Sequence, residues 1–118
     1  VALELLEQGI GLAGETGEYL WAAELWRLKG TLEARASDAD TPAGQAAEGS
    51  LVKSLEIARS QKAQAWILRS GNSLCRYWAT RGRTEEIRTL LQHTLMGLPE
   101  DEGDADLVEA RALQARFA

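Results

Sequence analysis

The stretch that decides the fold is residues 64–95, QAWILRSGNSLCRYWATRGRTEEIRTLLQHTL. Apolar or small residues recur in it every three or four positions, which predicts two amphipathic helices separated by a turn. The turn is expected at Arg81-Gly82, because glycine readily adopts the positive φ that ends many helices. Thr84 is the predicted N-cap of the second helix. The expected inward faces are Ile67, Gly71, Leu74 and Trp78 in the first helix, and Ile87, Leu91, Thr94 and Leu95 in the second.

The same spacing predicts four further helices outside this stretch. One lies within residues 1–16, one ends near Ala36, one ends at about Gln61, and the last is capped by Asp104. Their expected inward faces are, in chain order, Leu3, Leu6, Ile10 and Ala13; Trp21, Leu25, Leu28 and Leu32; Ala47, Leu51, Leu55 and Ala58; and Leu107, Ala110, Leu113 and Phe117.

The connections between these helices have the composition of loops. Glycines interrupt the pattern at residues 14–17, and residues 37–44 and 97–103 collect Gly, Pro, Ser and Asp. Both prolines, Pro42 and Pro99, fall in the two longer loops, where their missing N–H breaks no helix. β-branched residues are scattered, so no segment is predicted to be a strand.

The helices recur as an imperfect repeat. Leu6, Leu51 and Leu91 occupy matching positions 45 and 40 residues apart, and Gly30 matches Cys75 at an interval of 45. Small residues at the last two positions would let helix backbones approach closely. A helix pair cannot bury its apolar face alone, so stacked pairs are expected to build the core. The residues three positions after the matching leucines are small or carry a hydroxyl: Gly9, Ser54 and Thr94.

Residues 74–94 resemble the tetratricopeptide repeat. Leu74-Cys75 resembles its Leu-Gly step, Trp78 its aromatic residue and Gly82 the turn between its helices. The spacing of Ile87, Leu91 and Thr94 is similar to that of its second helix. A period of 40–45 residues exceeds the usual length of about 34, so we describe the pattern as tetratricopeptide-like.

The resemblance implies an all-α fold: about six helices in antiparallel pairs, stacked as a right-handed tetratricopeptide-like α-solenoid. The 118 residues would form a single helical-repeat domain. Its expected units are a half repeat (1–16), two full repeats (18–62 and 64–98) and a terminal helix (104–117). Because Val1 already falls inside a helical pattern, the chain is expected to be part of a longer protein.

Four phrases, at residues 24–30, 54–59, 73–78 and 106–113, together resemble the C-terminal repeat region of large bacterial signalling ATPases. Such proteins often join a nucleotide-cyclase-like or DNA-binding domain to a regulatory ATPase. The resemblance implies a cytoplasmic scaffold for protein–protein interaction and signal coupling. Its partner would be a protein or peptide, including other domains of the same parent protein, and association through the ends of the solenoid is open. The alternative is a small-ligand sensor that controls a linked ATPase or DNA-binding output.

Composition excludes several other classes. The net charge is −5 and the basic residues are spread along the chain, which argues against direct binding of nucleic acid or an anionic membrane surface. No apolar run approaches the roughly 18 residues of a spanning helix, and no signal peptide is evident. The single cysteine excludes an internal disulfide and is compatible with a reducing, cytoplasmic setting.

The sequence predicts neither an enzyme nor a cofactor or metal site. His93, the only histidine, lies off an apolar face and is expected in solvent, whereas Cys75 is expected to be a buried, inert thiol. One His and one Cys do not make a zinc site, which normally takes four ligands. The acidic residues 100–102, with Asp104 and Asp106, lack the spacing of a calcium loop and are expected in solvent.

The candidate partner-binding site is the face formed by the second and fourth predicted helices, since the first helix of each pair lines the concave side of such arrays. Arg69, Asn72 and Arg76 share one helical stripe that could hold a carboxylate. Pairing within the chain, for example of Glu24 with Arg27, is the equally weighted alternative. Trp21 and Trp78 are predicted in the core, and Trp26 and Trp66 beside it, where a sensor pocket could lie. The full candidate set is Glu24, Arg27, Trp66, Arg69, Asn72 and Arg76.

Overall fold

A computed structural model describes residues 2–16, 21–36, 42–98 and 104–118. In these ranges the chain forms six α-helices and no strand, which confirms the predicted all-helical class. The helices are α1 (Ala2–Thr16), α2 (Ala22–Ala36), α3 (Pro42–Ser60), α4 (Gln64–Thr80), α5 (Thr84–Leu95) and α6 (Ala105–Arg116).

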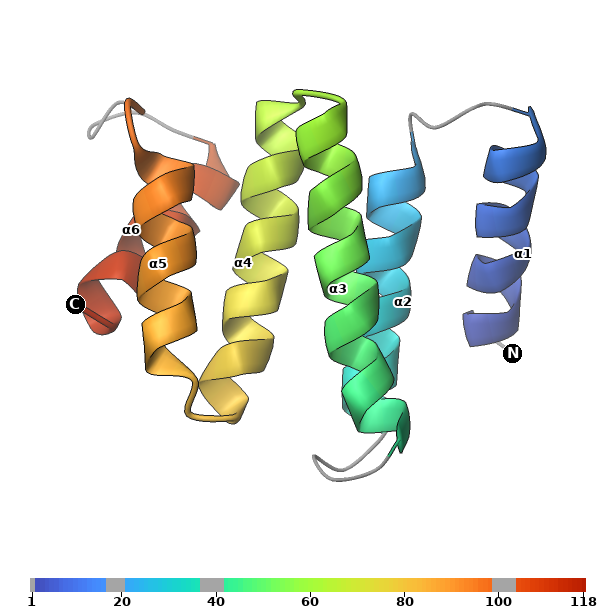
Figure 1. Cartoon of the computed structure of the whole chain (residues 1–118), viewed down its shortest axis with the longest axis horizontal. Coiled ribbons are helices and arrows are strands. Elements are labelled where there is room, and N and C mark those ends of the chain that lie inside the picture. Colours follow the sequence, from blue (N-terminus) through green and yellow to red (C-terminus); the bar gives the residue numbers. More distant parts are fainter. Residues whose placement is uncertain (1, 17–20, 37–41, 99–103) are drawn as a thin grey trace.

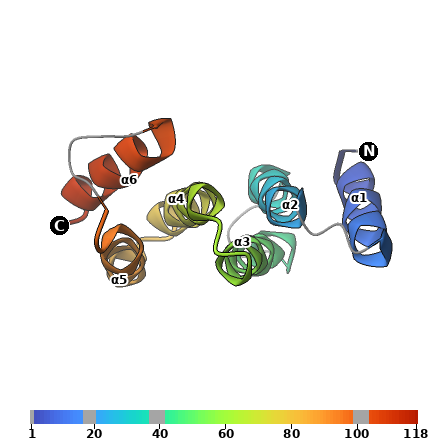
Figure 2. The ribbon, with the colours of Figure 1, turned by 90° about the horizontal axis from the view of Figure 1, so that it is seen from above.

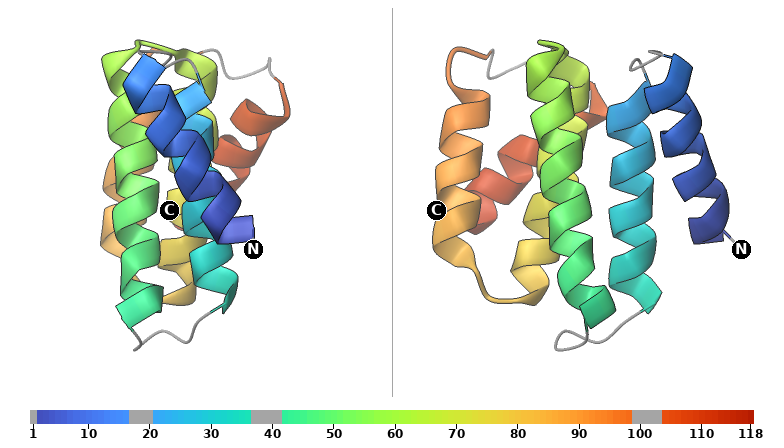
Figure 3. Two further views of the ribbon diagram at one scale, coloured as in Figure 1. Left: turned by 90° about the vertical axis from the view of Figure 1, so that its right-hand side faces the viewer. Right: turned by 45° about the vertical axis from the view of Figure 1, so that its right-hand side comes forward.

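The helices follow one another across the molecule in chain order, with the two termini at opposite ends (Figure 1). Seen from above, α2, α4 and α6 lie on one side and α3 and α5 on the other (Figure 2). Helix α1 lies against α2, and the inclined α6 contacts both α4 and α5 (Figure 3). The Cα extents are 38 × 33 × 19 Å, so the shortest dimension accommodates two layers of helices, each about 10 Å across.

The buried core runs through α3, α4, α5 and α6. The predicted inward faces of α3 and α6 are confirmed at Ala47, Leu51, Leu55, Ala58, Leu107, Ala110 and Leu113. In α5, Ile87, Leu91 and Leu95 are buried, and in α4 Leu74 and Cys75 join them. Two of the four residues predicted on the inward face of the second helix are not buried. Trp21, which precedes the first residue of α2, is 57% exposed, and Leu28 is also exposed, because apolar spacing does not tell which part of a face another element covers.

Two of the helix-end features that the sequence predicts are confirmed, and one is wrong. Gly82 has φ +69°, and the N–H of Arg83 donates to the carbonyl oxygen of Trp78 at 3.1 Å, so the predicted glycine turn is confirmed. Asp104 caps α6 by accepting a hydrogen bond from the Leu107 N–H at 3.0 Å. The prediction that Thr84 is an N-cap was wrong, because Arg83 holds that position and its side chain makes no capping bond.

The prediction that Pro42 lies in a loop was also wrong, because Pro42 is the first residue of α3. Proline is tolerated there, because the first N–H groups of a helix have no partner within it and the fixed φ suits the first turn. Pro99 and the acidic residues 100–102 lie outside the described residues.

A buried pair of hydroxyl groups ties three helices together. The Ser54 hydroxyl of α3 donates to the carbonyl oxygen of Ala23 in α2 at 2.6 Å. Its oxygen also lies 2.6 Å from the hydroxyl oxygen of Ser70 in α4. Because the Ser54 proton is engaged with Ala23, Ser70 must donate to Ser54. Both serines are fully buried, so neither hydroxyl can turn to water instead.

We therefore expect Ser54→Ala to lower the free energy of unfolding by about 1–3 kcal/mol, since it removes the hydrogen bond to the Ala23 carbonyl oxygen and leaves the buried Ser70 hydroxyl without its acceptor. Urea unfolding followed by circular dichroism measures the change. Ser60→Ala is the matched control: its exposed hydroxyl donates only to Ile57, and we expect a change within about 0.5 kcal/mol. Equal losses in the two variants would contradict the assignment.

Candidate functional site

Helix α6 lies across the arginine stripe of α4. The Arg69 Nε lies 3.3 Å from the Asp106 Oδ2, and the Asn72 side-chain amide donates to the Asp106 carbonyl oxygen at 2.8 Å. Arg76 forms an ion pair with Glu109. Sequence reasoning placed Asn72 off the core, but it is buried because α6 covers it. The three predicted stripe residues are thus brought together, each in contact with α6.

Glu24 and Arg27 extend this network to α2. Arg27 donates to both carboxylate oxygens of Glu24, from Nε at 2.9 Å and from Nη2 at 2.5 Å. That hydrogen bond is the main reason why the pKa of Arg27 is raised, against the opposing effect of burial. Glu24 also lies 3.8 Å from the Nη1 of Arg69. The pairing that the sequence offered as an alternative is therefore present, and the partner-binding role of these residues stays a prediction.

The tryptophans beside the core make contacts within the chain. The ring of Trp66 meets that of Trp21 edge to face, with centroids 5.8 Å apart, and Arg69 lies over Trp66 at 5.4 Å. The Nζ of Lys29 lies 5.2 Å from the ring centroid of Trp26. The described part of the chain has three pockets, of about 450, 510 and 660 Å³, and neither Trp26 nor Trp66 lines any of them. Trp78, not Trp26 or Trp66, borders the largest of these three.

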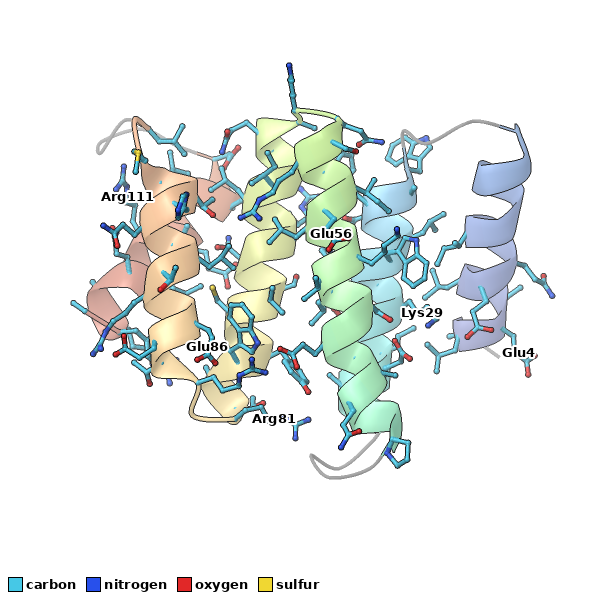
Figure 4. The ribbon with its side chains drawn as sticks, in the orientation of Figure 1. Glu4, Lys29, Glu56, Arg81, Glu86 and Arg111 are labelled. Carbon is cyan, nitrogen blue, oxygen red and sulfur yellow. The ribbon has the colours of Figure 1, made fainter. Side chains whose placement is uncertain are left out.

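A second cluster of arginines surrounds the pocket of about 510 Å³ between α2 and α4. Arg27 and Arg35 reach it from α2, and Arg76 from α4. Arg81, just after α4, completes the set, and Figure 4 labels it at that end of the helix. Sequence reasoning missed Arg35 and Arg81. The available signal was the spacing of four from Arg27 through Thr31 to Arg35, which puts all three on one face.

The lining of this pocket holds donors without acceptors among the described residues. The Ser73 oxygen accepts from Arg76 at 3.0 Å and from Arg27 at 3.4 Å, so its own proton has no assigned acceptor. The Nε of Arg81 is buried without a hydrogen-bond partner in the described part of the chain. The Arg81 guanidinium lies over the Tyr77 ring at 4.7 Å, and Tyr77 is itself anchored by its hydroxyl donating to the Gly44 carbonyl oxygen. The pocket therefore combines positively charged arginines with N–H and O–H donors that are available to an acceptor.

Cys75 and His93, the single cysteine and the single histidine, lie in different environments. Cys75 is fully buried, as predicted, and burial raises the pKa of its thiol to about 12. His93 is exposed on α5, as expected. Among the described residues, no group of three or more His, Cys, Asp or Glu side chains could hold a metal ion. None of the described helices has the length and apolar character needed to cross a membrane.

The buried thiol gives a direct test of packing around α4. Because the thiolate is the reactive form and the pKa of Cys75 is about 12, the thiol stays protonated at pH 8 and we expect no reaction with Ellman's reagent in the folded protein. In concentrated urea one thiol per chain should react rapidly. Rapid labelling without urea would mean that α4 opens readily and that Cys75 is not enclosed.

Comparisons with known proteins add no relative to this description. No protein-family model, no curated protein and no solved structure matches the chain.

Proposed function

We propose that this chain is a non-enzymatic scaffold for protein–protein interaction and signal coupling, and that it belongs to a cytoplasmic bacterial regulatory protein. We further propose that its helices form antiparallel pairs in a right-handed, tetratricopeptide-like α-solenoid. Three features support this fold: helices ordered in space as in the chain, alternation between two sides, and a glycine turn between α4 and α5. The sequence resemblance supports the setting.

The observation that carries the proposal is that two carboxylates on one face of α6 lie against the arginine stripe of α4. Asp106 and Glu109 are one turn apart on α6, and they contact Arg69 and Arg76 on α4. This contact indicates the kind of surface that α4 recognises: a helical segment with carboxylates on one face. Guanidinium groups suit such a ligand because their planar fork matches a carboxylate with two parallel hydrogen bonds.

The arginine side chains keep enough exposure to reach a second ligand. The side chain of Arg69 is 43% exposed and that of Arg76 is 48% exposed. Ion pairs of this exposure contribute only about 0–1 kcal/mol, so a partner can compete for them. Helix α6 itself stays in place, because Leu107, Ala110 and Leu113 are buried in the core. A partner would therefore bind beside α6 and contact the same two arginines of α4, Arg69 and Arg76.

Fluorescence anisotropy with two labelled helical peptides tests this proposal. One peptide carries Glu residues on one face at spacings of three and four, and the other carries Gln at the same positions. We expect tighter binding of the Glu peptide and weaker binding after Arg69→Gln with Arg76→Gln. Binding should be stronger after Asp106→Asn with Glu109→Gln, because this pair of substitutions removes the two α6 carboxylate charges that compete for the arginines.

A matched control separates the stripe from general charge. Arg59→Gln with Arg116→Gln removes the same charge from exposed positions outside the stripe and should leave the affinity unchanged. Equal affinity for the two peptides, or equal weakening by both arginine pairs, would show that the stripe does not recognise an acidic helix.

A further inference from the structure

We propose that the pocket between α2 and α4 binds a small molecule through a phosphate or carboxylate group, held by Arg27, Arg35, Arg76 and Arg81. This site shares Arg76 with the helix-binding stripe, but Arg35 and Arg81 make no contact with α6 among the described residues. Variants of Arg35 and Arg81 therefore test the pocket without touching the stripe, so that its failure and the failure of the scaffold function can be told apart.

Charge is the first argument. Four guanidinium groups border one pocket in a chain whose net charge is −5. Two of them have a carboxylate partner, Arg27 with Glu24 and Arg76 with Glu109. Arg35 and Arg81 have no ion-pair partner among the described residues, so the pocket carries positive charge that an anion would balance.

Directional donors are the second argument. The Ser73 proton and the Arg81 Nε–H, both described above, have no acceptor in the described part of the chain. The other three hydroxyl groups of the lining already donate to backbone carbonyl oxygens: Thr31 to that of Arg27 at 2.9 Å, Thr80 to that of Tyr77 at 2.6 Å, and Tyr77 to that of Gly44 at 2.9 Å. Buried donors without partners are rare, so each of these two donors has hydrogen-bonding capacity left for a ligand.

Size and rigidity are the third argument. A volume of about 510 Å³ lies within the range of about 300–1,000 Å³ that is usual for small-molecule sites. Leu51, Ala34 and Tyr77 give the pocket an apolar part, which would receive the uncharged part of the ligand. Arg81 is held over the Tyr77 ring, and Ser73 links Arg27 to Arg76. The anion-binding groups are thus positioned before a ligand arrives.

The test is an NMR titration of the ¹⁵N-labelled protein, following the Nε–H signals of the arginines. Inorganic phosphate and succinate are added separately, with sodium chloride keeping the ionic strength constant so that general screening does not change. We expect saturable shifts of the Arg35 and Arg81 signals at concentrations on the order of millimolar with at least one anion. Saturation by phosphate alone identifies a phosphate ligand, and saturation by succinate alone or by both anions identifies a carboxylate-accepting site.

Three variants make the result specific. Arg35 is exposed, and Arg35→Gln should weaken binding of the anion about ten-fold because it removes one charged hydrogen bond. Arg81→Lys keeps the charge over Tyr77 but loses the planar fork, so it should weaken binding while the protein stays folded. Arg59→Gln removes an exposed charge that does not border this pocket and should bind like the unmodified chain. Absence of saturable shifts with both anions, or equal affinity in all three variants, would overturn the proposal.

Discussion

Leu51→Ala should lower the free energy of unfolding by about 2–5 kcal/mol, the largest effect that we expect of a single truncation in this chain. Leu51 lies in the middle of α3 and is only 1% exposed. It contacts Gly30 of α2 and belongs to the buried cluster that includes Leu74, Ile87 and Leu91. Removing its branched end leaves a cavity that backbone-anchored neighbours on several helices cannot fill.

Urea unfolding measures this loss as a lower transition midpoint, and an unchanged dependence on urea would show that the unfolded surface is the same. Leu5→Ala is the matched control, because Leu5 lies in α1 and is 62% exposed. We expect its effect to stay within about 0.5 kcal/mol. A loss below about 1 kcal/mol for Leu51→Ala would contradict its central place in the core.

Gly30→Leu should lower the free energy of unfolding about as much as Leu51→Ala, because it overfills the core where Leu51→Ala leaves a cavity. Even a Cβ at Gly30 would lie 2.7 Å from the Leu51 Cγ and 3.1 Å from the Ala47 carbonyl oxygen, a backbone atom of α3. The helices must therefore separate to admit any side chain. We expect a loss of about 3 kcal/mol or more for Gly30→Leu, and about 1–2 kcal/mol for Gly30→Ala, where better helix propensity offsets part of the overpacking.

Gly49→Ala is the control for helix propensity. Gly49 is exposed in α3, and a Cβ there would meet no heavy atom within 4 Å. We expect this substitution to stabilise the protein by up to about 1 kcal/mol. Thermal melting of the three glycine variants should place Gly49→Ala above the unmodified chain and both Gly30 variants below it. Stabilisation by Gly30→Ala would mean that α2 and α3 are not in close contact.

A double-mutant cycle joins the two predictions. If Gly30 is required because Leu51 fills the space beside it, the cost of Gly30→Ala should shrink in the Leu51→Ala background. The two losses would then sum to more than the loss of the double variant. Additive losses would indicate that the two residues act independently.

Much of the helical core was predictable from spacing alone. Leu51, Leu91 and Leu113 were assigned to inward faces because apolar residues three or four apart fall on one side of a helix. The match of Gly30 with Cys75 predicts close helix packing at Gly30. This prediction is confirmed, because a Cβ at Gly30 would lie only 2.7 Å from the Leu51 Cγ. The rule failed at Trp21 and Leu28, because periodicity identifies an apolar face but not whether another helix covers it.

The candidate site was predictable only in part. Arg69, Asn72 and Arg76 share a stripe by their spacing, but their contacts with Asp106 and Glu109 span more than 30 positions of the chain. Arg81 belongs to a pocket with Arg27 for the same reason: the two are neighbours only after α2 and α4 pack beside each other.

By itself the sequence determined the helices, the two caps at Gly82 and Asp104 and the small residue at position 30, because these depend on local backbone preference and on periodicity. The tertiary structure decided which polar side chains meet. Side-chain charges pair across helices that are distant in sequence, and only the packing of α2, α4 and α6 sets those distances. It therefore decided that the arginine stripe contacts two carboxylates of α6 and that four arginines surround one pocket.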